Sequence, residues 1–321
     1  MADQEFLDRV FTMEVGRCTE AAAVAASTMI GRGDKEGADQ AAVTALRTAF
    51  NKLDMDGTVV IGEGERDEAP MLYIGEKVGT GKGPKIDIAL DPLEGTTLTA
   101  KAMANALAVV AMAQGGTLLH APDVYMQKIA VGPGYPDGVV DLDASVEDNI
   151  ESLAKAKGSP ASEITPCVLD RPRHEGIIAG ARKVGARGFL IPDGDVAGVF
   201  PTTESHTGID LYVGAGGAPE GVLAAAALRC VGGQMQGRLL FRDDAERGRA
   251  EKAGITNLDR KYGLMDLASG DVMFAATGVT NGTMLDGVKW DAQYVHTHTI
   301  VMRSKTGTVR YILARSRRET A

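Results

Sequence analysis

Two short stretches decide how this chain is organised. Residues 58–68 read TVVIGEGERDE, and residues 86–96 read IDIALDPLEGT. Each stretch begins with an apolar run typical of a buried strand and then passes directly into acidic residues. Proteins with α/β folds place their chemistry at strand ends, so both acidic turns are expected at a functional site.

The acidic residues of these stretches predict a metal site. In an extended segment, residues two apart face the same side, so Glu63, Glu65 and Asp67 can converge. Carboxylates at this density repel one another unless a cation lies among them, and all-oxygen ligands select Mg²⁺ or Mn²⁺ over zinc. A solvated acidic turn is the alternative. The carboxylates in question are Glu63, Glu65, Asp67, Glu68, Asp91 and Glu94.

The composition excludes several classes of protein. The chain has 321 residues, 44% hydrophobic and 24% charged, which is typical of a globular protein. Its net charge of −9 argues against nucleic acid or an anionic membrane as the main partner. The N-terminus lacks the features of a signal peptide, and the longest apolar run is far below the roughly 18 residues of a membrane span. The three dispersed cysteines indicate a reducing environment, so a cytoplasmic location is expected.

The first half of the chain reads as a mixture of helices and strands. Helices are predicted over residues 5–30 and 34–53, the second with Asp34 as its N-cap. Strands are predicted over 58–61 and 86–90, and Pro92 is expected to end the latter. Residues 106–140 read as a meander of apolar runs and turns, and a helix follows at 146–157.

After residue 160 strands and helices alternate, which implies an α/β layer. Strands are expected at 166–169, 188–191 and 209–213, with helices at 174–185 and 219–231. The end of the chain, roughly 271–278, 294–303 and 307–314, reads as mostly β. These patterns predict an N-terminal α+β metal-binding domain over 1–160 and a C-terminal α/β substrate-binding domain over 161–321.

Several turns could carry further chemistry. Residues 171–174 form a basic turn between a predicted strand and helix, where arginine can bind phosphate or remain solvated. The turn 193–195 can contact sugar hydroxyls or be a simple turn. Residues 214–220 resemble a dinucleotide fingerprint, but Pro219 replaces the third glycine. His296 and His298 share a strand face without a third nearby Cys or His, which favours a structural role.

Known catalytic signatures narrow the mechanism. The chain has no nucleophile elbow, no phosphate-binding P-loop and no Cys-x-x-Cys motif. Water activated by metal is left as the nucleophile. Lys35 and Asp39, four residues apart on one predicted helix face, read as a surface ion pair when taken alone.

Longer motifs resemble the class II fructose-1,6-bisphosphatases. The matching stretches run in order over nearly the whole chain: residues 31–35, 61–65, 67–73, 91–96, 121–126, 191–195 and 216–220. The resemblance implies an α/β fold, the layered αβαβα sandwich of the lithium-sensitive sugar phosphatases. It also implies a gluconeogenic enzyme that uses Mg²⁺ or Mn²⁺ to hydrolyse the C1 phosphate of fructose 1,6-bisphosphate.

The resemblance also assigns roles to residues. The implied metal ligands are Asp39, Glu63, Asp91, Glu94 and Glu220. The implied substrate contacts are Glu94, Gly95, Thr96, Tyr125, Arg171, Pro172, Arg173, Asp193, Gly194, Asp195 and Gly217. The implied catalytic residues are Lys35, Glu65, Asp67 and Thr96.

The expected reaction is direct transfer of the phosphoryl group to water, without a phosphoenzyme. Thr96 would position the water, while Arg171 and Arg173 would hold the distal phosphate. Three alternatives stay open: dual specificity toward sedoheptulose 1,7-bisphosphate, an inositol-type monophosphatase, and a nucleotide-binding dehydrogenase or regulatory module. The expected partners are a sugar bisphosphate and further copies of the chain in a dimer or tetramer.

Overall fold

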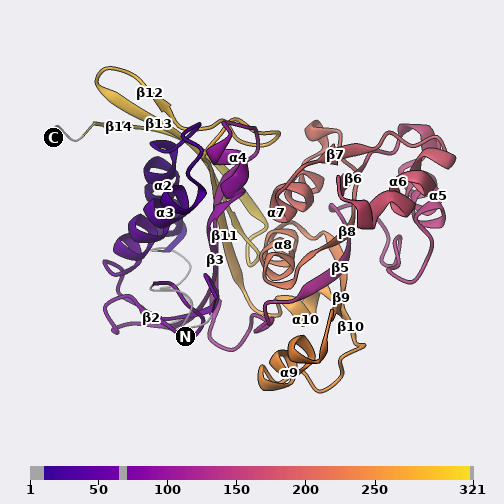
Figure 1. The fold of residues 1–321 in the computed structure, drawn as a ribbon, viewed down its shortest axis with the longest axis horizontal. Helices are drawn as coiled ribbons and strands as arrows, with labels where there is room; N and C mark the ends of the chain where they lie inside the picture. The colour runs from indigo at the N-terminus through magenta and orange to yellow at the C-terminus, as the bar shows by residue number, and fades with distance from the viewer. Residues whose placement is uncertain (1–10, 65–70, 319–321) are drawn as a thin grey trace. The chain divides into compact units, whose positions relative to one another are not determined.

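The structure is a computed structural model, and it describes residues 11–64 and 71–318. The chain divides into two compact units. Unit 1 comprises Met1–Leu118 and Gly270–Ala321, and unit 2 comprises Leu119–Ser269. Each unit has its own β-sheet with helices packed against it, so the expected α/β class is confirmed (Figure 1).

The sheet of unit 1 mixes parallel and antiparallel strands. Within the described residues it has eight strands, in the order β12-β13-β11-β4-β3-β1-β2, with β14 paired to β13. Only β1 and β3 run parallel among these pairs. The bounds are β1 (Asp56–Ile61), β2 (Lys77–Val78), β3 (Lys85–Glu94), β4 (Leu107–Gln114), β11 (Val272–Gly278), β12 (Lys289–Trp290), β13 (Tyr294–Arg303) and β14 (Thr308–Arg317).

Two helices cover one face of this sheet. Helices α2 (Phe11–Ser27) and α3 (Lys35–Phe50) lie side by side against it (Figure 1). The side chain of Asp34 caps α3 by accepting a hydrogen bond of 2.8 Å from the Gly37 N–H, as predicted. A fully buried apolar cluster joins both helices to the strands, which is where most of the stability of such helices originates. A short helix, α4 (Thr96–Ala100), follows β3 directly.

The sheet of unit 2 has six strands within the described residues, in the order β10-β9-β5-β8-β6-β7. Strand β6 runs parallel to β7 and β8, whereas β5 is antiparallel to β8 and β9. Strands β6, β7, β8 and β9 therefore all end at the same edge. The bounds are β5 (Tyr125–Val131), β6 (Pro166–Leu169), β7 (Phe189–Ile191), β8 (Leu211–Gly217), β9 (Gln234–Leu240) and β10 (Lys261–Gly263).

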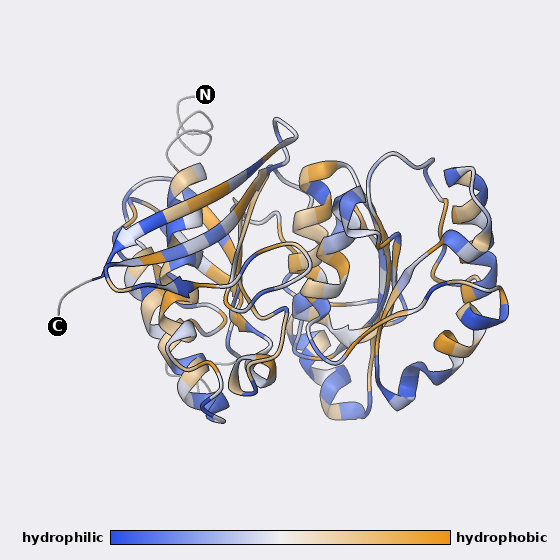
Figure 2. Ribbon diagram, turned by 90° about the horizontal axis from the view of Figure 1, so that it is seen from above, coloured by the Kyte–Doolittle hydropathy of each residue, from blue (hydrophilic) through white to orange (hydrophobic). Residues whose placement is uncertain are grey.

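Helices cover both faces of the unit 2 sheet. Helices α5 (Val146–Lys157) and α6 (Glu175–Lys183) lie on one face, and α7 (Asp195–Val199) and α8 (Ala218–Val231) on the other (Figure 1). Helices α9 (Asp244–Lys252) and α10 (Leu264–Leu267) follow in the chain. Hydrophobic and hydrophilic stretches alternate along many helices, as expected where one face is buried (Figure 2). None of the helices described combines the length and the apolar character that crossing a bilayer requires.

Two local expectations are wrong. Pro92 does not end the second strand, because β3 continues to Glu94 through an irregularity in its pairing with β4. The apolar runs of residues 106–140 do not form a meander, since β4 joins the sheet of unit 1 and β5 joins that of unit 2. Pro92 is tolerated because it lies in the irregular stretch between Asp91 and Glu94, and the meander is wrong because β5 pairs with β8 and β9, which lie far along the chain.

The compact units are also divided differently from the predicted domains. The expected boundary near residue 160 falls inside unit 2, between α5 and β6. The C-terminal strands return to unit 1, where β11 pairs along its whole length with β4. The assignment of metal binding to one part of the chain and substrate binding to the other stays a prediction.

Candidate active site

The carboxyl ends of β1 and β3 bring two acidic turns together. The strands are parallel neighbours, and Ile61 lies opposite Ala89. Two residues further along each strand stand Glu63 and Asp91, so both reach the same edge of the sheet. Gly62 permits this turn, because a Cβ there would lie 2.1 Å from the carbonyl oxygen of Leu72.

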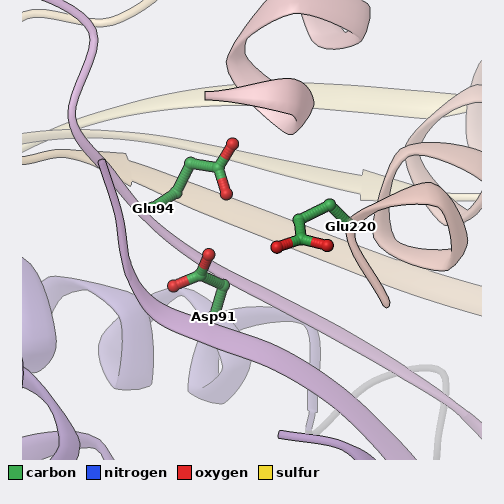
Figure 3. Close-up of side chains that lie close together, drawn as sticks. All are labelled: Asp91, Glu94 and Glu220. Atoms are coloured by element: carbon green, nitrogen blue, oxygen red, sulfur yellow. The ribbon is translucent and has the colours of Figure 1, made fainter. Parts of the chain in front are cut away.

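An irregular stretch of β3 turns Asp91 and Glu94 toward the same space. Asp91 pairs with Val109 and Glu94 with Leu107, so one extra residue is inserted on β3. Without this bulge, residues three apart would face opposite sides of the sheet. Carboxylate oxygens of the two residues lie within 4.8 Å of one another, as Figure 3 illustrates. Gly95 then takes a φ of 86° where α4 begins.

Asp39 adds a further carboxylate to this acidic edge. Its side chain hydrogen-bonds to Glu63, although the two residues are far apart in the sequence. Burial raises the pKa of Asp39, and the hydrogen bond to Glu63 partly lowers it. Within the described ion pairs there is none between Lys35 and Asp39, so the surface-pair interpretation is not supported.

The acidic edge of unit 1 therefore offers only oxygen donors. Asp39, Glu63 and Asp91 are partly accessible, and Glu94 is buried. Such a donor set fits a hard divalent cation rather than zinc. Lys35 is exposed at the start of α3, and Thr96 starts α4 beside Glu94. The predicted residues Glu65, Asp67 and Glu68 lie outside the described residues.

The remaining predicted metal ligand belongs to unit 2. Glu220 stands in the first turn of α8, where the helix dipole favours a negative charge. Gly217 precedes this helix, and a Cβ at that position would lie 1.9 Å from the Glu220 carboxylate. The glycine therefore lets the carboxylate approach the backbone closely.

Unit 2 has a polar hollow at the edge where four of its strands end. Arg171 follows β6, Asp193 follows β7, and Gly217 ends β8. Tyr125 begins the antiparallel β5 directly opposite Gly217. The hollow has a volume of about 290 Å³, close to the lower end of ligand pockets. Its walls include Asp123, Tyr125, Arg171, Arg173, Asp193, Gly194, Asp195, Gly216, Gly217, Glu220 and Arg242.

Three arginines around this hollow are held by protein groups. Arg173 donates from Nε and Nη2 to the carbonyl oxygen of Ala215, at 3.0 and 2.7 Å. Arg171 lies 3.6 Å from the carboxylate of Asp193. Arg242 donates from Nε to Glu246 at 2.5 Å. Anchored guanidinium groups lose less freedom when they bind an anion, which suits a phosphate site.

The Tyr125 ring lies close to two of these guanidinium groups. The Cζ atoms of Arg173 and Arg242 lie 5.1 and 5.6 Å from its ring centroid. These distances are within the range of cation–π attraction. Arg242 was missed in the sequence because β9 itself was not predicted, although its place just after an apolar run is the signal that could have found it.

His174 contacts the ends of two strands at the same edge of the sheet. It is buried, its Nδ1 lies 2.8 Å from the Leu169 carbonyl oxygen, and its Nε2 accepts from the Ala215 N–H at 2.8 Å. Burial is the main cause that lowers the pKa of His174. The neutral imidazole thus joins the end of β6 to the end of β8, and Ala215 also accepts the hydrogen bonds of Arg173.

The two histidines of β13, His296 and His298, do not belong to a metal-binding group among the described residues. His296 lies 2.8 Å from an Asp291 carboxylate oxygen, and His298 accepts from the Asp286 N–H at 3.0 Å. Both are on β13 in unit 1. Among the described residues no third Cys or His joins them in a metal-binding group, in accord with a structural role.

Comparison with known proteins identifies the family. A family model described as "Bacterial fructose-1,6-bisphosphatase, glpX-encoded" matches residues 9–316. The chain is 46% identical over 318 residues to "Fructose-1,6-bisphosphatase 1 class 2" of Escherichia coli strain K12, covering 95% of this chain and 94% of that protein. Proteins named "Fructose-1,6-bisphosphatase class 2" from Escherichia coli O6:H1 and Shigella flexneri match to the same extent. The chain belongs to the class 2 fructose-1,6-bisphosphatase family.

Proposed function

We propose that this chain hydrolyses the C1 phosphate of fructose 1,6-bisphosphate to give fructose 6-phosphate and phosphate. The observation that carries the proposal is the acidic edge of unit 1, where a turn, a bulge and a helix bring four carboxylates together in a chain of this family. The names of its relatives support the same substrate. They do not favour a dehydrogenase or a nucleotide-binding module.

The metal ligands of the proposal are Asp39, Glu63, Asp91, Glu94 and Glu220. Four belong to the acidic edge, and Glu220 is carried over from the resemblance to the family. Carboxylate oxygens favour Mg²⁺ or Mn²⁺. When bound, these ions supply positive charge to the phosphoryl group and activate the attacking water.

The protein's own residues orient the substrate. Arg171 and Arg173 bind the phosphate that is not hydrolysed, and Arg242 adds a third guanidinium beside Tyr125. Asp193, Gly194 and Gly217 contact the sugar. Holding the distal phosphate converts its binding energy into orientation of the reacting end. Pro172 sets the backbone between the two arginines.

The reaction adds water to phosphorus and breaks the bond to the C1 oxygen. Gly95 and Thr96 lie next to Glu94, and the Thr96 hydroxyl orients the attacking water. Glu65 and Asp67 relay the proton that the water loses, and Lys35 contributes a positive charge near the transferred phosphoryl group. The leaving C1 oxygen takes up a proton, and no covalent phosphoenzyme forms.

Phosphate release tests the proposal directly. The purified protein is incubated with fructose 1,6-bisphosphate, sedoheptulose 1,7-bisphosphate, inositol 1-phosphate and fructose 6-phosphate, each with and without Mn²⁺. We expect release from fructose 1,6-bisphosphate only when metal is present. Oxygen-labelled water should place its label in the released phosphate. Absence of turnover with any metal, or label found only in the sugar, would overturn the proposed chemistry.

A cytoplasmic location and a homo-oligomer, dimer or tetramer, complete the proposal. Both rest on the sequence. Light scattering of the purified protein measures its mass in solution. A monomer at working concentration would show that the proposed oligomer is wrong.

A further inference from the structure

A fully buried lysine lies beneath the arginine-lined hollow of unit 2. Lys128 is on β5, has no exposed surface, and faces the side of the sheet that α7 and α8 cover. Its ammonium group forms an ion pair with Asp195, which is only 7% exposed. Burying two charges costs several kcal/mol per ion, and replacing such a pair by apolar residues is often neutral or stabilising. Stability alone therefore gives little reason for this pair.

The buried lysine connects three separate segments of the chain. Its Nζ donates to the Asp195 carboxylate at the start of α7 and to the Gly217 carbonyl oxygen at the end of β8, the latter at 2.8 Å. The Tyr212 hydroxyl donates to the other Asp195 oxygen. We call Lys128, Asp195 and Tyr212 the buried triad. Both Asp195 oxygens accept protein hydrogen bonds, which fix the carboxylate at the wall of the hollow, and its expected contact with the sugar stays a prediction.

The buried triad joins the two segments whose groups contact the predicted phosphate-binding arginines, Arg171 and Arg173. Arg171 pairs with Asp193, two residues before Asp195. Arg173 is held by the carbonyl oxygen of Ala215, two residues before Gly217. Gly216 lies directly over the triad, because a Cβ there would come within 1.7 Å of an Asp195 oxygen. These contacts restrict movement of the Asp193 turn relative to the end of β8.

We infer that Lys128 is a positioning residue for sugar phosphate binding. By tying Asp195 to the Gly217 carbonyl, it sets the spacing between the supports of Arg171 and Arg173. A phosphate bound by two guanidinium groups requires that spacing to be held, since small displacements of binding groups weaken oriented binding strongly. The inference rests on the proposed function, because it assigns the hollow to the phosphate that is not hydrolysed.

The test compares Lys128→Met with Tyr212→Phe and with a control, Lys157→Met. Lys157 forms a 2.6 Å ion pair with Asp210 in the same unit, outside the hollow. For fructose 1,6-bisphosphate with Mn²⁺, we expect Lys128→Met to raise KM roughly 10- to 100-fold with kcat changed less than about threefold. Tyr212→Phe should raise KM less and in the same direction, whereas Lys157→Met should leave KM unchanged.

A merely structural role predicts a different result. Loss of folded protein would lower the apparent kcat and leave KM at the wild-type value. Lys128→Met leaves Asp195 buried without its cation and could fail to fold. Tyr212→Phe removes a single hydrogen bond and no charge, and it then decides the question. An unchanged KM in the folded triad variants overturns the inference while the proposed function stands.

Calorimetry with fructose 6-phosphate in metal-free buffer separates the two proposals. If the wild-type protein releases no phosphate but binds fructose 6-phosphate, the proposed function fails and the triad variants still test positioning. Weaker binding by Lys128→Met or Tyr212→Phe supports the inference, and equal binding overturns it. A wild-type protein that binds no fructose 6-phosphate overturns the inference as well.

Discussion

In unit 1, carboxylates lie at the carboxyl ends of the parallel strands β1 and β3. In unit 2, guanidinium groups lie at the edge of the sheet where β6, β7, β8 and β9 end. The two edges are built in different ways. Asp39 and Glu63 lie within hydrogen-bonding reach of each other, so they repel one another when both are ionised, and a cation between them would relieve that repulsion. The arginines of unit 2 are already held by Ala215, Asp193 and Glu246. Under the proposed function, a phosphate would meet side chains already held in place in unit 2, whereas the acidic edge would be completed by metal.

The largest effect is expected at the acidic edge. Glu63→Gln removes a proposed metal ligand and should lower turnover of fructose 1,6-bisphosphate with Mn²⁺ at least about 100-fold, since bound metal would supply several kcal/mol of stabilisation. The metal-free protein should unfold at an equal or higher temperature, because repulsion with Asp39 is relieved. Glu36→Gln, an exposed change of equal charge on α3, is the control. A Glu63→Gln enzyme that stays active with metal would show that the ligand assignment is wrong.

The arginine-lined hollow should respond through KM. Arg173→Ala removes the proposed charge-assisted contact to phosphate, of a kind worth roughly 1.5–3 kcal/mol, so KM should rise roughly 10- to 100-fold with little change in kcat. Arg182→Ala, an exposed arginine at the end of α6, should change neither value. Equal KM values for both variants would show that Arg173 does not bind the substrate. The proposed difference between the acidic edge of unit 1 and the arginine-lined edge of unit 2 would then lose support.

In unit 2, a pH-dependent effect on stability is expected from His174. The folded protein lowers the pKa of His174, chiefly through burial, so the unfolded chain binds its proton at higher pH. The stability that His174 contributes is present above about pH 6.5 and is lost as pH falls through its lowered folded pKa. His174→Leu should cost on the order of 2 kcal/mol at pH 8, because two hydrogen bonds are lost.

Thermal unfolding of His174→Leu and wild type between pH 5 and pH 8, compared at each pH, measures this effect. The difference in stability should narrow as the solution becomes acidic. A constant difference across the range would mean that His174 is not held neutral by the fold.

The smallest effect is expected for the buried thiols, whose reactivity should be alike in the two units. Burial raises the pKa of Cys18 in unit 1 and of Cys167 in unit 2 to about 12. Neither thiol should react with a disulfide reagent at pH 8 in the native protein, whereas both should react in denaturant. Ser205→Cys, at an exposed position, serves as the reactive control. Rapid native labelling of Cys18 or Cys167 would indicate that the unit containing it opens locally.

Much of the local structure could be predicted because its causes are local. The Asp34 cap, the helix at 146–157 and the strand at 166–169 depend on neighbouring residues, and all three are found. Strand β9 and the helix after it were missed, and Arg242 with them. The sequence alone assigned Lys128 no role, since nothing near it reveals that Asp195 and Gly217 come to the same point.

What the sequence by itself determined is which residues follow each strand and the family to which those turns belong. Only the tertiary structure decided which turns meet. The parallel pairing of β1 with β3 and the bulge before Glu94 bring the acids together, and the order of strands in unit 2 brings the arginines to one edge. The physical reason is that side-chain chemistry and turn geometry are properties of a few adjacent residues. Strand order depends instead on burying apolar surface across the whole unit.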